Sequence, residues 1–343
     1  MTDEQKLTQV LLAPHAGPGV GGGHVMRCLT LADALAERGA QCRFAVSHAG
    51  ADLIARFAPG RFEVKALANP GELAVVVAGA HPQALILDDY RLDATVERAL
   101  KRQSGRLVVL DDLADRSHAA DLVIDSGLGR KEDDYRRLAP KAIVLAGPRY
   151  ALVRPQFAAH RRDPGARAGS ALDRIFVSFG LSDVDEIAER AVMLLLSLAP
   201  SARLEVVIAA DAPSLKGLAR LAARDIRVRL HVDARDFAGL IATCDLAVGA
   251  GGSALWERAA VGIANLVVVV ADNQRAMAAQ LQAAGLACTV DLYAPQFEER
   301  FAEQLTALRD AGLRATLADA LADVCDGEGA GRAADEILWL ARR

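Results

Sequence analysis

A glycine-rich segment close to the amino terminus is the first place where residue types and spacing could support chemistry. The sequence reads GPGVGGGH over residues 17–24, and a helical pattern follows it. Glycine allows positive φ and close backbone approach, and the free amides and dipole of a helix start favour an anion or a polar ligand. Because the same dipole disfavours an imidazolium, we expect His24 to be neutral and able to accept a proton. The competing interpretation is a flexible turn with a capping histidine.

Acidic and phenolic residues follow two apolar runs in the first half of the chain. The segment LDDY at residues 87–90 ends one run, and Asp111-Asp112 ends the next. Carboxylates and a phenol in such places can bind sugar hydroxyls or orient a neighbouring base. Aspartate at a strand end is also a common helix N-cap, so each aspartate pair taken alone favours a structural role. For Tyr90 the binding and structural interpretations are balanced.

Two glycine-containing turns in the second half could bind phosphate. In the segment GAGGSALWE at residues 249–257, backbone amides at Gly252 and Ser253 can cradle a diphosphate at a helix start. Glu257 falls one turn later on the same face, where it can accept hydrogen bonds from a ribose diol. A capping box is the competing interpretation, although the offset from Ser253 to Glu257 is four rather than three. In FGLSD at residues 179–183, Gly180 and Ser182 could hold a phosphate, or the segment is a capping turn.

A polar loop at residues 271–275, ADNQR, follows the most apolar run of the chain. This segment suits a ligand-orienting loop that includes Asn273 and Gln274, and a helix N-cap at Asp272 or Asn273 is an equally good interpretation. The remaining histidines show no metal-ligand spacing, and the five cysteines show no CxxC pattern. We therefore predict reduced core thiols, no metal site and no cofactor.

Short apolar runs alternate with amphipathic segments, a rhythm typical of βα units with parallel sheets. The predicted strands of the first half are Thr8–Ala13, Cys42–Ser47, Ala84–Asp88, Arg106–Asp111, Leu122–Asp125 and Ala142–Ala146. Those of the second half are Arg174–Phe179, Leu204–Ala209, Ile226–Leu230, Leu246–Gly249 and Asn265–Val270. Every cluster described above therefore follows the carboxyl end of a predicted strand.

A polar segment rich in Pro, Gly and Arg, HRRDPGARAGS at residues 160–170, is the predicted linker. It separates an amino-terminal Rossmann-like domain at 1–160 from a carboxyl-terminal one at 170–329. The terminal segment 330–343 is helical in pattern, and we expect it to dock back on the first domain. Two doubly wound domains would place their ligand-binding loops on a common central cleft.

Composition excludes several other classes of protein. The chain has 343 residues, of which 52% are hydrophobic and 24% charged, with a formal net charge of −4, as expected of a globular chain. No basic stripe indicates nucleic-acid binding, and no segment is long and apolar enough for stable insertion in a membrane. The polar first residues differ from a signal peptide. We expect a cytoplasmic protein.

The ordered set of motifs resembles one family. These are GxGHVMRCLTLA, ILDDY, FGLSD, GAGGSALWE and DNQ, and the similarity runs through almost the whole chain. The family comprises the UDP-2,4-diacetamido-2,4,6-trideoxy-β-L-altropyranose hydrolases of pseudaminic acid biosynthesis, with relatives called spore coat polysaccharide proteins. The resemblance implies a GT-B fold and metal-independent hydrolysis, which cleaves the anomeric C–O bond with inversion and releases UDP.

The resemblance also assigns roles to individual residues. Its implied catalytic residues are His24, as general base for water, Tyr90 and Asn273. Its implied substrate-binding residues are Gly23, Arg27, Asp88, Gly180, Ser182, Gly252, Ser253, Glu257 and Gln274. The chain departs from the family pattern in two segments. Ala13-Pro14-His15 stands where Arg-x-Asp is common, and Leu181 follows Gly180 where a second glycine is usual.

The expected function is thus hydrolysis of a UDP-sugar, with UDP-sugar and UDP as the ligands. One alternative is a glycosyltransferase of the same fold, in which His24 activates an acceptor hydroxyl. The other is a nucleotide-sugar-binding protein without catalysis, which the altered positions near residue 14 and at Leu181 would fit.

Overall fold

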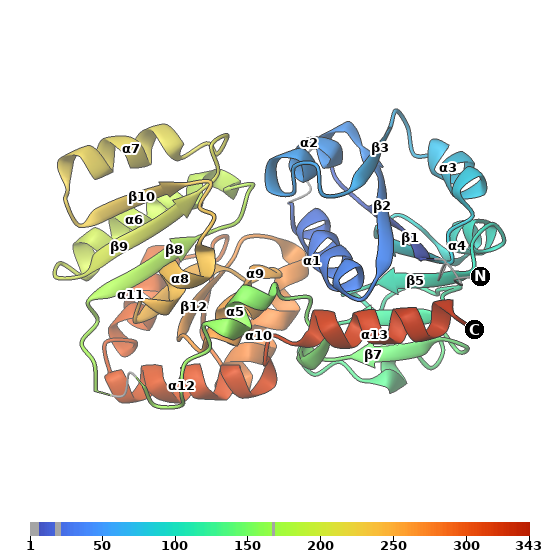
Figure 1. Cartoon of the computed structure of the whole chain (residues 1–343). Coiled ribbons are helices and arrows are strands. Elements are labelled where there is room, and N and C mark those ends of the chain that lie inside the picture. Colours follow the sequence, from blue (N-terminus) through green and yellow to red (C-terminus); the bar gives the residue numbers. More distant parts are fainter. Residues whose placement is uncertain (1–6, 18–21, 167–168) are drawn as a thin grey trace. The chain divides into compact units, whose positions relative to one another are not determined.

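The computed structural model describes residues 7–17, 22–166 and 169–343. The chain forms two compact units, coloured by sequence in Figure 1. One unit comprises Met1–Leu152 together with Glu328–Arg343, and the other comprises Val153–Gly327. Each unit contains one parallel sheet with helices on both faces, as the alternating sequence pattern predicted.

The sheet of the first unit has the strand order β3-β2-β1-β4-β5-β6-β7, and neighbouring strands pair in parallel. Its strands are β1 (Thr8–Pro14), β2 (Ala40–Ser47), β3 (Glu63–Leu67), β4 (Ala84–Asp88), β5 (Arg106–Leu110), β6 (Leu122–Asp125) and β7 (Ile143–Ala146). The strand order reverses between β1 and β4. In doubly wound sheets, ligands bind beside the carboxyl ends of the strands at such a switch point.

The helices of the first unit cover both faces of this sheet. One face packs against α1 (Gly23–Glu37), α2 (His48–Phe57) and α13 (Gly329–Ala341), and the other packs against α3 (Glu72–Ala80) and α4 (Ala94–Lys101). Successive residues of β1 point to opposite cores, since Leu12 joins the first and Leu11 the second. The carboxyl-terminal helix α13 runs beside α1, where Arg38 Nε donates to Asp335 Oδ1 at 2.7 Å.

The sheet of the second unit has the order β10-β9-β8-β11-β12-β13, again with parallel neighbours. Its strands are β8 (Arg174–Ser178), β9 (Arg203–Ile208), β10 (Val228–Val232), β11 (Leu246–Ala250), β12 (Asn265–Val269) and β13 (Cys288–Asp291). Here the order reverses between β8 and β11, so the second switch point lies at the ends of these two strands.

Helices also cover both faces of the second sheet. One core contains side chains of α6 (Ile187–Leu198), α7 (Leu215–Arg224), α11 (Phe297–Ala307) and α12 (Ala311–Val324). On the other face, Phe176 of β8 contacts Phe237, whose ring also lies 6.0 Å from that of Phe157. The remaining helices are α5 (Pro155–Ala159), α8 (Phe237–Ala242), α9 (Ala254–Val261) and α10 (Arg275–Ala283), with short 3-10 turns η1 (Glu132–Tyr135), η2 (Pro148–Tyr150), η3 (Val184–Glu186) and η4 (Asp272–Gln274).

The boundary between the units differs from the predicted linker. The chain passes into the second unit at Val153, and residues 160–166 already belong to it. Arg162 Nη2 donates to the carbonyls of Ala242 and Cys244 at 2.7 and 2.5 Å, and Arg161 Nη2 donates to that of Ala322 at 2.8 Å. The arginines that made this segment resemble a linker therefore anchor it to the second unit. Among the described residues, no helix is long and apolar enough to cross a membrane.

Candidate functional site

The predicted site residues of the first unit gather at its switch point. Helix α1 begins at Gly23, which places His24 in the first turn, and Asp88 is the last residue of β4. Tyr90 lies two residues beyond that strand end. Residues 18–21 of the glycine-rich segment lie outside the described residues. The first unit therefore brings the predicted base, aspartate and tyrosine together.

Asp88 is fully buried, and both of its oxygens are occupied. His24 Nδ1 lies 2.6 Å from Oδ1, while Arg27 Nε donates to Oδ2 at 2.6 Å and Arg27 Nη2 to Oδ1 at 2.5 Å. Burial by itself raises the pKa of Asp88, but Arg27 and His24 outweigh burial and hold the pKa well below its usual range. Asp88 is thus an ionised hydrogen-bond acceptor. The structure shows Asp88 bonded to His24 and Arg27, so its contact with substrate stays a prediction.

The Asp88 contact fixes the tautomer of His24. An ionised carboxylate can only accept, so Nδ1 of His24 carries the proton. When the ring is neutral, Nε2 is therefore the lone-pair acceptor, which is the form that a general base needs. The His24 side chain is 12% exposed, so the ring is mostly enclosed but not sealed from solvent. Two local electric fields act on His24. One is the dipole at the start of α1, and the other comes from the Asp88–Arg27 pair.

Arg27 connects this pair to Tyr90 through a second carboxylate. Its Nη1 donates to Asp112 Oδ1 and Oδ2 at 2.9 and 2.7 Å, and the Tyr90 hydroxyl donates to Asp112 Oδ2. Burial, followed by the Asp112 charge, raises the pKa of Tyr90 far above its usual range, so the phenol stays protonated. Its ring packs edge-on against His24 with centroids 4.8 Å apart. Because its proton points to Asp112, the Tyr90 oxygen can only accept a hydrogen bond from a ligand.

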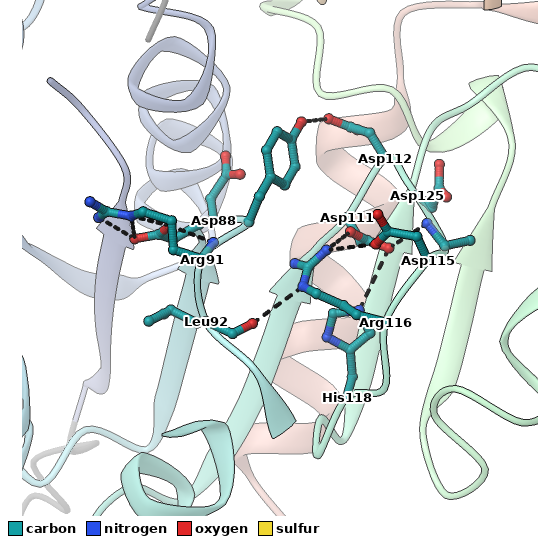
Figure 2. A network of polar contacts seen from close by, with 12 residues as sticks. Asp88, Arg91, Leu92, Asp111, Asp112, Asp115, Arg116, His118 and Asp125 are labelled. Carbon is teal, nitrogen blue, oxygen red and sulfur yellow. Dashed lines mark hydrogen bonds and ion pairs between the residues drawn. The ribbon is translucent and has the colours of Figure 1, made fainter. Parts of the chain in front are cut away.

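A buried polar network supports the strand ends next to this site. Figure 2 shows Asp111 directed toward Arg116 and His118, whereas the neighbouring Asp112 points the other way. Tyr135 Oη lies 2.7 Å from both Asp111 Oδ2 and Asp125 Oδ2. The structural interpretation of the aspartate pair thus holds for Asp111, whereas Asp112 belongs to the candidate site.

His15, one of the residues that depart from the family pattern, also lies at this switch point. Its ring centroid is 6.3 Å from that of His24, and its Nδ1 is 3.8 Å from Asp89 Oδ1. Burial lowers the pKa of His15, which favours the neutral ring. The position that carries a polar group in the resembled family therefore carries a neutral imidazole here.

In the second unit, the loop after β11 has unused backbone donors. The amides of Gly252 and Ser253 donate to no residue that the structure describes, and Ser253 makes no capping hydrogen bond at the start of α9. The capping interpretation of Ser253 is therefore wrong. Gly249 allows this loop to start close to β8, because a Cβ at that position would lie 2.2 Å from the Ser178 carbonyl oxygen. Free amides at a helix start are suited to an anion.

Three further predicted residues belong to this unit: Glu257 in α9, and Asn273 and Gln274 after β12. Glu257 lies one turn into α9, where its Oε1 accepts from Arg154 Nε at 2.9 Å. Gln274 Oε1 accepts from the amides of Gly251 and Val270 at 3.3 and 3.2 Å, so Gln274 ties the loop after β11 to the end of β12. Asn273 is exposed in η4. Gln274 therefore shapes the loop, while the side chain of Asn273 is accessible to a ligand.

The loop after β8 contains the last two predicted residues. Gly180 has φ +84°, and both Gly180 and Ser182 are exposed. The neighbouring Asp183 is buried and accepts from the amides of Ala188 and Ser214 at 3.0 and 2.9 Å. Asp183 therefore fills the structural role, which leaves Ser182 accessible. The predicted residues form two sets, one at the switch point of each unit.

The sequence alone did not identify two residues that contact the predicted site residues. Arg154 and Asp112 were not singled out as site residues, although each binds a predicted one directly. The Asp111-Asp112 doublet after a predicted strand was a usable signal for Asp112. No local signal marked Arg154, because its partner lies 103 residues away.

Comparisons with known proteins place the chain first in a structural class. Its fold matches MurG of Acinetobacter baumannii with a TM-score of 0.67 at 15% identity, over 96% of this chain and 99% of that one. It matches the spinosyn rhamnosyltransferase SpnG, solved with thymidine diphosphate, with a TM-score of 0.62 at 16% identity, over 95% and 100% of the two chains. The fold is therefore GT-B, with two Rossmann-like domains, as predicted.

A sequence relative then agrees with the resemblance seen in the motifs. The chain is 23% identical over 234 residues to the UDP-2,4-diacetamido-2,4,6-trideoxy-β-L-altropyranose hydrolase of Campylobacter jejuni, which covers 68% of this chain and 81% of the relative. No family model matches the chain. The suspected similarity to these hydrolases is thus confirmed.

Proposed function

We propose that this protein hydrolyses a UDP-linked 2,4-diacetamido-2,4,6-trideoxy sugar to the free sugar and UDP, as a step of pseudaminic acid biosynthesis. The observation that carries the proposal is the His24–Asp88 pair, in which a buried carboxylate presents Nε2 of the histidine as a base. The similarity to the Campylobacter jejuni hydrolase and the GT-B fold both support an enzyme that acts on nucleotide sugars.

In the proposed reaction, His24 Nε2 takes a proton from water as the water oxygen attacks the anomeric carbon. The bond between that carbon and the phosphate oxygen breaks on the opposite face, so the anomeric configuration inverts. The ionised Asp88 stabilises the imidazolium that forms, while Arg27 holds Asp88 in place. A positioned base contributes roughly 10²–10⁴-fold in rate.

The polarity of Tyr90 fits a diacetamido sugar. Its oxygen accepts rather than donates toward a ligand, since its proton is held by Asp112. An acetamido N–H or a proton of the attacking water is a suitable donor for it. Gly23 is the first residue of α1 and precedes His24. We assign Arg27 to positioning instead of substrate binding, because its guanidinium already donates to the carboxylates of Asp88 and Asp112.

The UDP portion is assigned to the second unit. The free amides of Gly252 and Ser253 bind the diphosphate and stabilise the charge that develops as UDP leaves. Glu257 accepts from the ribose hydroxyls through Oε2, which bonds to no described residue. Gly180 and Ser182 line the phosphate side, and Asn273 orients sugar or water, with Gln274 holding the loop.

The competing function is glycosyl transfer, which the similarity in fold to a rhamnosyltransferase favours. The two functions differ in whether UDP release requires an acceptor. Incubation with the UDP-diacetamido sugar alone, followed by proton NMR, reports both UDP release and the anomer first formed. Release without an acceptor and with inversion supports hydrolysis. Release that appears only when an acceptor alcohol is added would establish transfer.

His24→Ala tests the assignment of the base. We expect kcat to fall by roughly 10²–10⁴-fold while the affinity for UDP, measured by calorimetry, is unchanged. The matched control is His48→Ala, which removes an exposed histidine at the start of α2 in the same unit. An undiminished rate of UDP release by folded His24→Ala would show that His24 is not the base.

A further inference from the structure

A buried cation lies directly behind the loop assigned to the diphosphate. Arg258, in the second turn of α9, is 1% exposed and is the largest fully buried side chain among the described residues. Arginine is rarely buried to this extent without a carboxylate, because removing the charge from water is costly. The environment of Arg258 therefore requires an explanation.

The partners of Arg258 are neutral. Its Nε donates to Asn265 Oδ1 at 2.5 Å and its Nη2 to the Ala250 carbonyl at 2.8 Å. No described carboxylate lies within 4.0 Å, and the adjacent Glu257 pairs with Arg154 instead. Burial lowers the pKa of Arg258 to about 10, so the guanidinium is still charged at neutral pH. The charge is hydrogen-bonded to neutral groups, and the field of the adjacent Glu257, itself paired with Arg154, offsets it only in part.

The guanidinium lies against the end of β11. Its Nη1 would be 3.0 Å from a Cβ placed on Gly249, and Nη2 binds the carbonyl of Ala250, the last residue of that strand. The next residues begin the loop whose Gly252 and Ser253 amides donate to no described residue. Glycine at 249 is needed for the approach of β8, and it also leaves room for the Arg258 guanidinium. The positive charge thus contacts Ala250, two residues before the Gly252 amide.

We propose that Arg258 is a positioning residue whose buried charge is neutralised by the diphosphate of a bound nucleotide. This inference rests on the proposed function, since it deepens the role of the same loop. Arg258 acts on the anion through the loop, both by its field and by fixing the Ala250 carbonyl. Because the guanidinium is withdrawn from water, its field is screened less than that of a surface arginine.

A second buried arginine of the same unit provides a contrast. Arg314 is 4% exposed and forms no ion pair within 4.0 Å among the described residues, but the fields of Asp245, Asp310 and Asp173 act on it. Its Nη1 also donates to the Leu308 and Arg309 carbonyls after α11. These aspartates and the negative end of that helix offset its charge. Arg258 lies in the last turn of α9, but its guanidinium reaches back to the Ala250 carbonyl, on the side where that helix starts and its dipole is positive.

The test compares two probes, UDP and uridine, by calorimetry. Wild-type protein should bind UDP more tightly than uridine, and Arg258→Met should reduce the UDP affinity on the order of 10- to 100-fold while uridine binding is kept. Arg258→Lys, which keeps a charge, should retain most of the preference for UDP. Arg314→Met is the matched control and should leave the ratio of the two affinities unchanged.

The outcomes separate the inference from the proposed function. If folded Arg258→Met keeps the wild-type ratio, the inference is overturned and the proposed function stands. If the wild type itself does not prefer UDP to uridine, both are overturned. Should Arg258→Met not fold, the double variant Arg258→Met/Asn265→Leu replaces both hydrogen-bonding side chains with apolar ones, and the same reduction in ratio is expected of it.

Discussion

The buried imidazole of His118 predicts a loss of stability as the pH rises. Its side chain is 0% exposed, with Nδ1 2.8 Å from Glu97 Oε1 and Nε2 3.6 Å from Asp111 Oδ2. Burial opposes the charged ring, but the two carboxylates outweigh burial and raise the pKa of His118 to about 9. The contacts of His118 fix Asp111, which follows β5 and directly precedes Asp112 of the candidate site (Figure 2).

The size of the effect follows from the two pKa values. The unfolded chain has a histidine pKa of about 6.5, so the protonated ring is favoured in the folded state and stabilises it fully below that pH. A difference of about 2.5 pKa units corresponds to roughly 3 kcal/mol. By linkage, about 2 kcal/mol of this remains at pH 7.5 and less than about 0.5 kcal/mol at pH 9.

Urea unfolding of wild type and His118→Gln at several pH values between about 6 and 9.5 measures this contribution. Asp125, whose pKa burial raises to about 6, titrates in the same network, so the difference between the two proteins is the relevant quantity. We expect their free energies of unfolding to converge as the pH rises. A difference that stays constant across this range would refute the assignment of a buried imidazolium, and His48→Gln serves as the exposed control.

Two further substitutions test the candidate site. Asp88→Asn should lower kcat on the order of 10²–10³-fold with UDP affinity unchanged, because the neutral amide cannot balance the imidazolium and its NH2 group cannot accept from Arg27 Nε. Steady-state kinetics and UDP titration check this, and an unaltered kcat would contradict it. Glu257→Gln should reduce the preference for UDP over 2′-deoxy-UDP about 10-fold, since a charged acceptor for the ribose hydroxyl is lost; equal preference in variant and wild type would count against the ribose assignment.

The strands that the sequence predicted are mainly those buried on both faces. Apolar runs such as Ala84–Asp88 and Leu122–Asp125 are observed with the predicted bounds. The two unpredicted strands, β3 and β13, lie at sheet edges, and β3 reads EVKAL with its charged residues exposed. Edge strands carry less apolar sequence because one side meets solvent, so periodicity alone does not distinguish them from loops.

The location of the site was predictable because the carboxyl ends of parallel strands meet at one edge of a sheet. The roles of its carboxylates were not. Asp88 is 64 residues from His24, and Asp112 is 85 residues from Arg27, so no local spacing links either pair. Whether an aspartate at a strand end caps a helix, supports a core or orients a base depends on which side chains the fold brings to it.

The charge balance of the two sites differs in a way that suits the two ends of a nucleotide sugar. In the first unit, one arginine faces Asp88 and Asp112, so the set has one negative charge in excess and becomes neutral when His24 takes a proton. In the second unit, Arg258 has no carboxylate partner among the described residues, and the loop beside it has free amides. That excess of positive charge suits a diphosphate, so each site has the charge that its assigned half of the substrate requires.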